Sequence, residues 1–148
     1  MKICFVDVSK TDYSFKNLND DYIRGAESIL INLSKNLSNI GHQVFVFNNS
    51  KYEFKSINYN WFNLERIKKF NNFFDIVISN NDTNILSKFQ CKKKFVISHS
   101  ILSIEKAYRK NQILNYFINK PTYLLIGNYH KKNMSKIFSI FNSKVINY

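Results

Sequence analysis

The fold is decided by residues 25–48, which read Gly-Ala-Glu-Ser-Ile-Leu-Ile-Asn-Leu-Ser-Lys-Asn-Leu-Ser-Asn-Ile-Gly-His-Gln-Val-Phe-Val-Phe-Asn. Apolar side chains recur in the first part at steps of three and four residues, the period of a helix with one buried face. They are Ala26, Ile29, Leu30, Leu33, Leu37 and Ile40. Gly41 then ends the helix, because glycine readily adopts the left-handed backbone that follows a helix C-terminus. Residues 43–48 are mostly apolar, so the stretch predicts a helix that turns directly into a buried strand.

Five further short apolar runs predict strands, at residues 2–8, 74–79, 94–98, 122–126 and 144–146. Most of these runs are continuously apolar and do not alternate, which is typical of parallel strands covered on both faces. Weaker helical periodicity between them predicts further helices over 62–71, 83–90, 102–118 and 130–141. This alternation of strands and helices predicts an α/β fold, a Rossmann-like doubly wound parallel sheet flanked by helices.

Length and composition predict one folded domain with a positive charge. The 148 residues, 45% of them hydrophobic, suffice for a single domain over 1–148 and are too few for two of ordinary size. With 3 glycines and 1 proline, collagen-like and low-complexity classes are excluded. The net charge of +12 is uneven, since residues 1–74 carry 10 basic and 7 acidic side chains and residues 75–148 carry 12 and 3. The second half is therefore a candidate surface for an anionic membrane or a nucleic acid.

Cysteine and histidine spacing bears on compartment and on metals. Cys4 and Cys91 lie far apart without a CxxC pair, so neither a disulfide framework nor a zinc ribbon is expected, and a reducing compartment fits best. The three histidines have no metal-ligand spacing, and we expect neither a metal ion nor a cofactor. Asp7 interrupts the first apolar run too early for a secretory signal, and no later run is long enough to span a membrane. We expect a cytoplasmic protein, at most peripheral on the inner face of the membrane.

In a parallel α/β sheet, ligands bind at the carboxyl ends of the strands, where loops and helix N-termini converge. The loop after the first predicted strand enters its helix through Arg24 and Gly25. A glycine there lets a ligand approach the backbone closely, and the helix end and the arginine both favour phosphate. The alternative is that Gly25 only completes a tight turn and Arg24 is solvated.

Polar residues follow three other predicted strands. Asn80, Asn81 and Asp82 follow the third and could hold a ligand hydroxyl, although asparagine and aspartate also cap helices and form turns, and capping is the favoured interpretation because Asp82 precedes a predicted helix. His99 directly follows the fourth, where an imidazole can bind a sugar hydroxyl or phosphate or exchange a proton near neutral pH. The alternative for a lone histidine is a structural hydrogen bond. Asn128, in the loop after the fifth, is a further candidate substrate-binding residue.

Several stretches resemble one enzyme family. Ile23-Arg24-Gly25-Ala26-Glu27, followed by Gly41-His42-Gln43-Val44, resembles the opening of glycosyltransferase family 4 enzymes of GT-B fold, which have a Gly-Gly-Ala-Glu helix start and a Gly-His-Glu-Val strand entry. Phe95-Val96-Ile97-Ser98-His99 is similar to the family's strand that ends in histidine. Lys144-Val145-Ile146-Asn147 resembles its run into the interdomain linker.

The resemblance implies roles for particular residues. It covers the whole chain but only the N-terminal, acceptor-binding half of a family enzyme. Gly25 would approach the diphosphate of a nucleotide-sugar donor, with Arg24 in place of the family's first glycine, and Glu27 would belong to the same substrate-binding segment. His99 would lie beside the transferred sugar as the catalytic residue.

The function expected from this resemblance is transfer of a sugar from a nucleotide-sugar donor to a glycan or lipid-linked acceptor. A donor-binding domain, in the same chain or in trans, would be required, and the chain alone is expected to be nearly inert because both halves must close around the donor. The alternative is a non-catalytic basic α/β module that binds a nucleic acid or a protein. Nucleic acid is the less favoured partner, because the aromatic residues do not interleave with the basic ones as a stacking platform requires.

Overall fold

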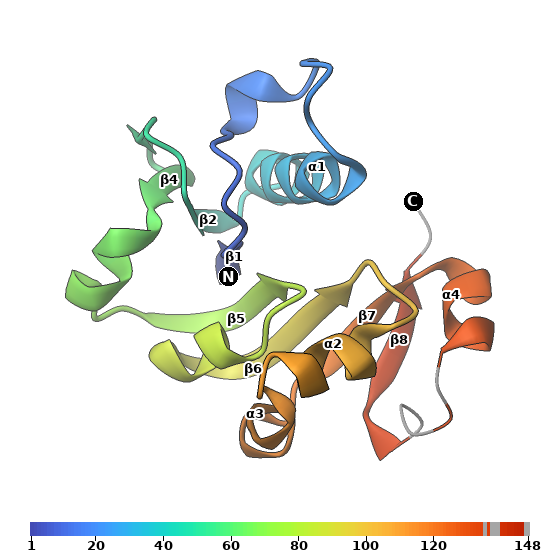
Figure 1. Ribbon diagram of the computed structural model, residues 1–148. Helices are drawn as coiled ribbons and strands as arrows, with labels where there is room; N and C mark the ends of the chain where they lie inside the picture. Colours follow the sequence, from blue (N-terminus) through green and yellow to red (C-terminus); the bar gives the residue numbers. More distant parts are fainter. Residues whose placement is uncertain (135, 137–139, 147–148) are drawn as a thin grey trace.

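A continuous sheet crosses the molecule in the computed structural model, which describes residues 1–134, 136 and 140–146 (Figure 1). Its strands, in chain order, are β1 (Lys2–Val6), β2 (Gln43–Asn48), β3 (Phe54–Lys55), β4 (Tyr59–Asn63), β5 (Phe73–Asn80), β6 (Gln90–Ser98), β7 (Thr122–Ile126) and β8 (Ser143–Ile146). Between them lie the α-helices α1 (Gly25–Asn39), α2 (Ser103–Arg109), α3 (Ile113–Asn119) and α4 (Gly127–Asn133). Three 3-10 helices complete the described elements, η1 (Phe15–Asn17), η2 (Leu64–Lys69) and η3 (Asn84–Lys88).

The strand order is β3-β4-β2-β1-β5-β6-β7-β8, and all neighbours pair in parallel except β3 and β4. From β1 the chain builds outward through β2 to β4, then returns to β5 on the other side of β1 and builds outward through β6 and β7 to β8. The parallel strands β4-β2-β1-β5-β6-β7 thus have the 3-2-1-4-5-6 order of a Rossmann-like sheet, with β3 and β8 added at its edges. The fold is α/β, and the order of building reverses between β1 and β5.

Each face of the sheet is covered by its own hydrophobic core. On β1, Ile3 and Phe5 pack on the face covered by α1, whereas Cys4 and Val6 face the second core. That second core holds buried residues of η2, η3, α2 and α3, among them Ala107 and Tyr116. Because both faces are covered, the central strands are apolar at successive positions, as their continuous runs predicted.

Aromatic side chains anchor the long loop between β1 and α1. The ring of Phe15 makes edge-to-face contacts with Tyr52, Phe54, Tyr59 and Trp61, at centroid distances between 5.2 and 5.9 Å. Such pairs contribute about 0.5–1.5 kcal/mol each beyond the area they bury. The loop is therefore packed onto the β3–β4 edge and does not hang free in solvent.

The central part of the prediction is confirmed. The helix expected over 25–40 is α1, and Gly41 follows it with a φ of 89°. The six predicted strands correspond to β1, β2, β5, β6, β7 and β8, although β1 ends at Val6 and β6 begins earlier, at Gln90. The run ending in Asn147 reaches beyond the described residues.

Four predicted helices are wrong in extent or type. The region 62–71 begins with the last residues of β4, because Trp61 and Phe62 are buried beside β2, and continues as the 3-10 helix η2. The helix expected over 83–90 is only the short 3-10 helix η3. The helix expected over 102–118 is broken into α2 and α3, where Asn111 takes a left-handed φ of 53°. The helix expected over 130–141 begins earlier, as α4, and residues 135 and 137–139 lie outside the described part.

Candidate functional site

A cavity of about 280 Å³ opens where the strand order reverses, at the carboxyl ends of β1 and β5 and the N-terminus of α1. In open α/β sheets this reversal point is where ligands bind, because the loops diverge there and leave a crevice. The lining residues come from four segments of the chain: Asp7, Val8, Ser9, Arg24, Ala26, Glu27, Asn80, Asn81 and Lys110.

A buried carboxylate with one exposed partner forms part of the wall. The side chain of Glu27 is 1% exposed, whereas that of Arg24 is 64% exposed. Arg24 donates from Nε to Glu27 Oε1 at 2.8 Å and also ion-pairs with it through Nη2, which raises the pKa of the arginine. The second oxygen of Glu27, Oε2, is buried and has no hydrogen-bond partner among the described residues. It is an acceptor that a bound hydroxyl could satisfy.

Asp7 organises the floor of the cavity. It directly follows β1, is 2% exposed, and its carboxylate accepts from the backbone N–H of Ser9 at 2.8 Å. The same carboxylate accepts from the Tyr13 hydroxyl at 2.7 Å and from Asn80 Nδ2 at 3.1 Å. Burial and the neighbouring charge of Asp7 raise the pKa of Tyr13, so that hydroxyl remains a donor. Asn80 consequently turns its Nδ2 to Asp7, and its buried Oδ1 has no partner in the described part of the chain.

Asn81 links this cavity to His99. It adopts a left-handed φ of 55°, and its Oδ1 accepts from the backbone N–H of His99 at 2.9 Å. The His99 ring is partly buried, and its Nε2 makes no hydrogen bond with any described residue. This burial, with the nearby charge of His130, lowers the pKa of His99, while Asp7 and Glu27 oppose the shift. The ring is therefore neutral near pH 7 and can either donate or accept a proton.

Gly25 is the first residue of α1 and is exposed. Its φ is not in the left-handed region, and a Cβ placed on it would meet no heavy atom within 4 Å. Neither backbone conformation nor packing within the described chain requires glycine here. Its effect is to leave the N–H groups at the start of α1 open beside the cavity, where an anion is favoured.

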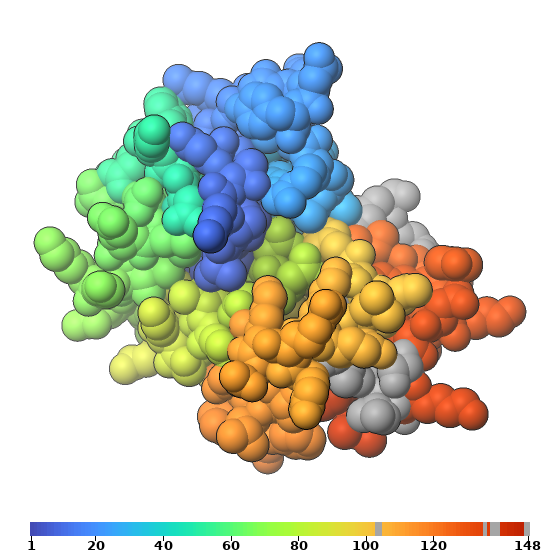
Figure 2. Space-filling view, in the orientation of Figure 1, coloured from blue at the N-terminus to red at the C-terminus, as the bar shows by residue number. Residues whose placement is uncertain are grey.

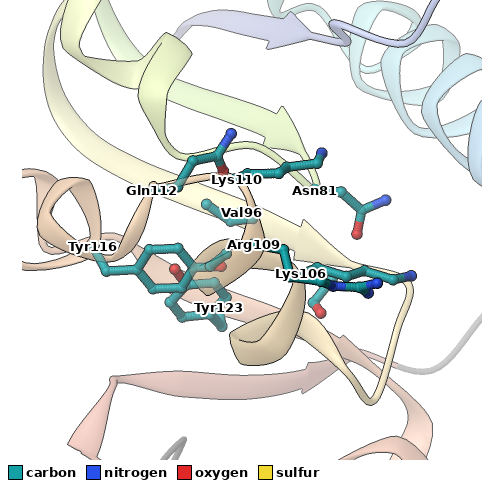
Figure 3. Close-up of a pocket in the computed structure, with 10 residues that line it drawn as sticks. Asn81, Val96, Lys106, Arg109, Lys110, Gln112, Tyr116 and Tyr123 are labelled. Atoms are coloured by element: carbon teal, nitrogen blue, oxygen red, sulfur yellow. The ribbon is translucent and has the colours of Figure 1, made fainter.

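A second pocket, of about 410 Å³, adjoins the first and shares Asn81 and Lys110 with it (Figure 3). Figure 3 shows Lys106 and Arg109 of α2 lying together on the side of the pocket where Asn81 also lies. The deeper wall carries the stacked rings of Tyr116 and Tyr123, whose centroids are 5.3 Å apart. The two pockets together form a cleft with oxygen acceptors at the α1 end and cations at the α2 end.

Four of the six predicted substrate-binding residues line this cleft. Arg24, Glu27, Asn80 and Asn81 all contribute to the first cavity. Gly25 lies between two of its lining residues, and His99 is held next to it through Asn81. By contrast, Asn128 is exposed in α4 and lines neither pocket.

Three polar residues that line the first cavity were not predicted as site residues from the sequence. The sequence places Asp7 in the first predicted strand and Ser9 in the loop that follows it. It places Lys110 inside the helix predicted over 102–118. Asp7 had a signal of its own, since it is a charged residue placed directly after a buried parallel strand. Asn80 and Asn81 do not cap a helix, because their side chains bind Asp7 and the backbone of His99. Asp82 does act as the capping interpretation predicts, since it accepts from the backbone N–H of Ile85 near the start of η3.

The arrangement suits a ligand that has both hydroxyl groups and a negative charge. Glu27 Oε2, Asn80 Oδ1 and Ser9 Oγ are buried acceptors with no partner among the described residues. Arg24, Lys110 and the start of α1 supply positive charge next to them. Within residues 1–134, 136 and 140–146, no group of three or more His, Cys, Asp and Glu side chains could hold a metal ion, and no helix is long and apolar enough to cross a membrane.

Comparison of the chain with protein-family models, with curated proteins and with solved structures gave no significant match.

Proposed function

We propose that the chain is the acceptor-side domain of a glycosyltransferase of GT-B type, which uses a nucleotide-sugar donor. One observation carries the proposal: Glu27 and Asn80, each with a buried oxygen acceptor that has no partner among the described residues, line the same cavity as Arg24, which precedes the first residue of α1. Hydroxyl groups of a sugar satisfy the acceptors, and the phosphate groups of the donor neutralise the cations. The motif resemblance at residues 23–27, 41–44 and 95–99 supports the same reaction class.

In this proposal each residue has a distinct role. Gly25 leaves room for the diphosphate to reach the backbone N–H groups of α1, and Arg24 adds a charged contact. Glu27 and Asn80 orient sugar hydroxyls. His99 acts as the catalytic residue beside the transferred sugar, where its neutral ring can exchange a proton with a hydroxyl. The acceptor, a glycan or a lipid-linked sugar, enters along the α2 end of the cleft.

The reaction is tested by combining the chain with a donor-binding domain, in trans or joined in one polypeptide, and measuring sugar transfer with a panel of nucleotide sugars. We expect transfer that is lost in His99→Ala and strongly reduced in Gly25→Val. His42→Ala is the matched control, because His42 lies in the turn between α1 and β2 and lines neither pocket. Absence of transfer with every donor, or equal activity in the His99 and His42 variants, would contradict the proposal.

A different feature favours the alternative, a basic binding module. A groove of about 470 Å³ at the amino ends of β6 and β7 is lined by Lys92, Lys93, Lys94, Lys120 and Lys144, among others. Two of these lysines have described partners, Lys92 on Asp75 and Lys94 on Asn119. If the groove binds nucleic acid, affinity for DNA or RNA must fall steeply with salt and must weaken in Lys93→Glu/Lys144→Glu. Affinity that is unaffected by this pair would remove the alternative.

A further inference from the structure

The outward face of α3 carries large apolar side chains that are left in contact with solvent. Leu114, Phe117 and Ile118 are 74%, 52% and 72% exposed. Their spacing of three and four residues places them on one face of the helix, whereas Tyr116 on the opposite face is buried in the core beneath. Grouped exposure of this kind, unlike scattered apolar side chains, marks an interaction surface.

An apolar groove continues this face toward β8. It has a volume of about 290 Å³ and is lined by Tyr116, Phe117, Lys120, Pro121, Ile140, Phe141 and Asn142. Ile140 adds a further exposed apolar side chain, at 62%. The face of α3 and the groove together form what we call the α3 surface.

Positive charges lie in the groove of the α3 surface, at Lys120, and on the neighbouring helix α2, which contacts α3. Residues 101–120 contain Lys106, Arg109, Lys110 and Lys120, all exposed, against one acidic residue, Glu105. In Figure 2 the orange part of this segment lies on the visible outer surface of the molecule. An exposed apolar face bordered by lysine and arginine is the composition of elements that lie in the interface of an anionic bilayer.

We infer that the α3 surface docks on an anionic lipid bilayer, with Leu114, Phe117 and Ile118 inserted among the headgroups. The cations favour this occupant over a second copy of the chain. A symmetric dimer through the same face would bring the cluster of Lys106, Arg109, Lys110 and Lys120 against its own copy, with one glutamate to offset four positive charges on each side. A negatively charged leaflet instead attracts every one of them.

The docking has a consequence for the cleft. Lys106, Arg109 and Lys110 also line the 410 Å³ pocket, so a bilayer held against the α3 surface would lie next to the α2 end of the cleft. Docking of this kind would bring a lipid-linked acceptor to the cleft, and that role rests on the proposed function. The docking itself is measured without any nucleotide sugar, so its failure and the failure of sugar transfer are separate results.

The test is sedimentation of the full chain with vesicles of phosphatidylcholine that contain none or about one third phosphatidylglycerol. We expect binding to the anionic vesicles, and this binding should weaken with added salt. Lys106→Gln/Arg109→Gln should weaken it by about fivefold for each basic residue removed. Leu114→Gln/Ile118→Gln should weaken binding at least tenfold, because two apolar side chains are then no longer inserted in the bilayer. Glutamine keeps the helix propensity of the replaced residues, and circular dichroism verifies the fold.

Ile40→Gln/Ile57→Gln is the matched control, since these residues are 70% and 87% exposed and lie outside the α3 surface, after α1 and between β3 and β4. Vesicle binding by this control should equal that of the wild type. Equal losses in the two pairs, or binding that ignores phosphatidylglycerol content, would overturn the inference. The inference would also be overturned if the wild type binds no vesicles but forms a dimer in sedimentation velocity, and if Leu114→Gln/Ile118→Gln dissociates this dimer. The α3 surface would then serve self-association.

Discussion

Replacing Arg24 by methionine should destabilise the protein far more than the exposure of this arginine suggests. An ion pair between two exposed side chains contributes little, about 0–1 kcal/mol. Here only the arginine is exposed, at 64%, and the carboxylate of Glu27 is 1% exposed. Arg24→Met removes both described donors to the Glu27 carboxylate, Nε and Nη2 of Arg24. The negative charge of Glu27 is then buried without a partner among the described residues.

The expected cost lies between two limits. Loss of one partner from a fully buried pair costs about 3–5 kcal/mol. Because Glu27 lines an open cavity where water can solvate part of the charge, we expect about 2 kcal/mol. For a chain of this length that corresponds to a fall in Tm of about 6 °C. Thermal unfolding followed by circular dichroism at low ionic strength measures it.

Two comparisons isolate the cause. Arg66 makes a similar ion pair with Glu53, but the side chain of Glu53 is 30% exposed, so Arg66→Met should lower Tm much less. In Arg24→Met/Glu27→Gln the buried charge is gone, and most of the lost stability should return. If Arg24→Met and Arg66→Met have the same effect, or if Glu27→Gln restores nothing, burial of the Glu27 carboxylate is not what makes this pair matter.

Three further predictions concern the same site. Gly25→Ala should leave the free energy of unfolding unchanged or raise it by up to about 1 kcal/mol, because the added Cβ meets no neighbour. The same variant should weaken nucleotide-sugar binding, measured by calorimetry, at least tenfold. A loss of stability would contradict the open space around Gly25. Tyr13→Phe should lower the free energy of unfolding in urea by about 1.5–3 kcal/mol, because it deprives the buried Asp7 carboxylate of a donor at 2.7 Å, and an unchanged midpoint would refute this. His99→Gln should make the free energy of unfolding less dependent on pH just below 6.5, the ordinary pKa of imidazole. In that range the unfolded wild type takes up a proton on His99, whereas the folded chain does not, because folding lowers the pKa of His99. Identical slopes of Tm against pH for wild type and variant between pH 7 and 5 would show that this histidine does not titrate as described.

The parts of the fold that follow from local pattern could be predicted. The run Val44-Phe45-Val46-Phe47 is buried on both faces, so its apolar character at every position indicated a parallel strand directly. Strand β4 could not be found in this way, because Tyr59, Asn60 and Asn63 break the apolar run. Its position depends on pairing with β2, which is 11 residues or more away in sequence. Likewise the break between α2 and α3 is fixed by Gln112, whose side chain donates to Asp82 at 2.8 Å.

The candidate site divides in the same way. Arg24, Glu27, Asn80 and Asn81 could be placed at one edge of the sheet, since each follows a strand or begins a helix. Which atoms remain unpartnered could not be known, because that depends on contacts between segments. Asn80 Oδ1 is left open only because Asp7, 73 residues away, takes the amide of the same side chain.

The anchored loop between β1 and α1 bears on how quickly the cleft can fill. Tyr13 is bound at its hydroxyl by Asp7 and at its carbonyl by Asn48, and Phe15 is fixed among four rings at the β3–β4 edge. The loop that brings Ser9 and Arg24 to the cleft is therefore fixed before any ligand arrives, and little conformational entropy remains to be lost there on association. Encounter at this wall should then be governed by diffusion and charge, with no slow reshaping of the chain beforehand.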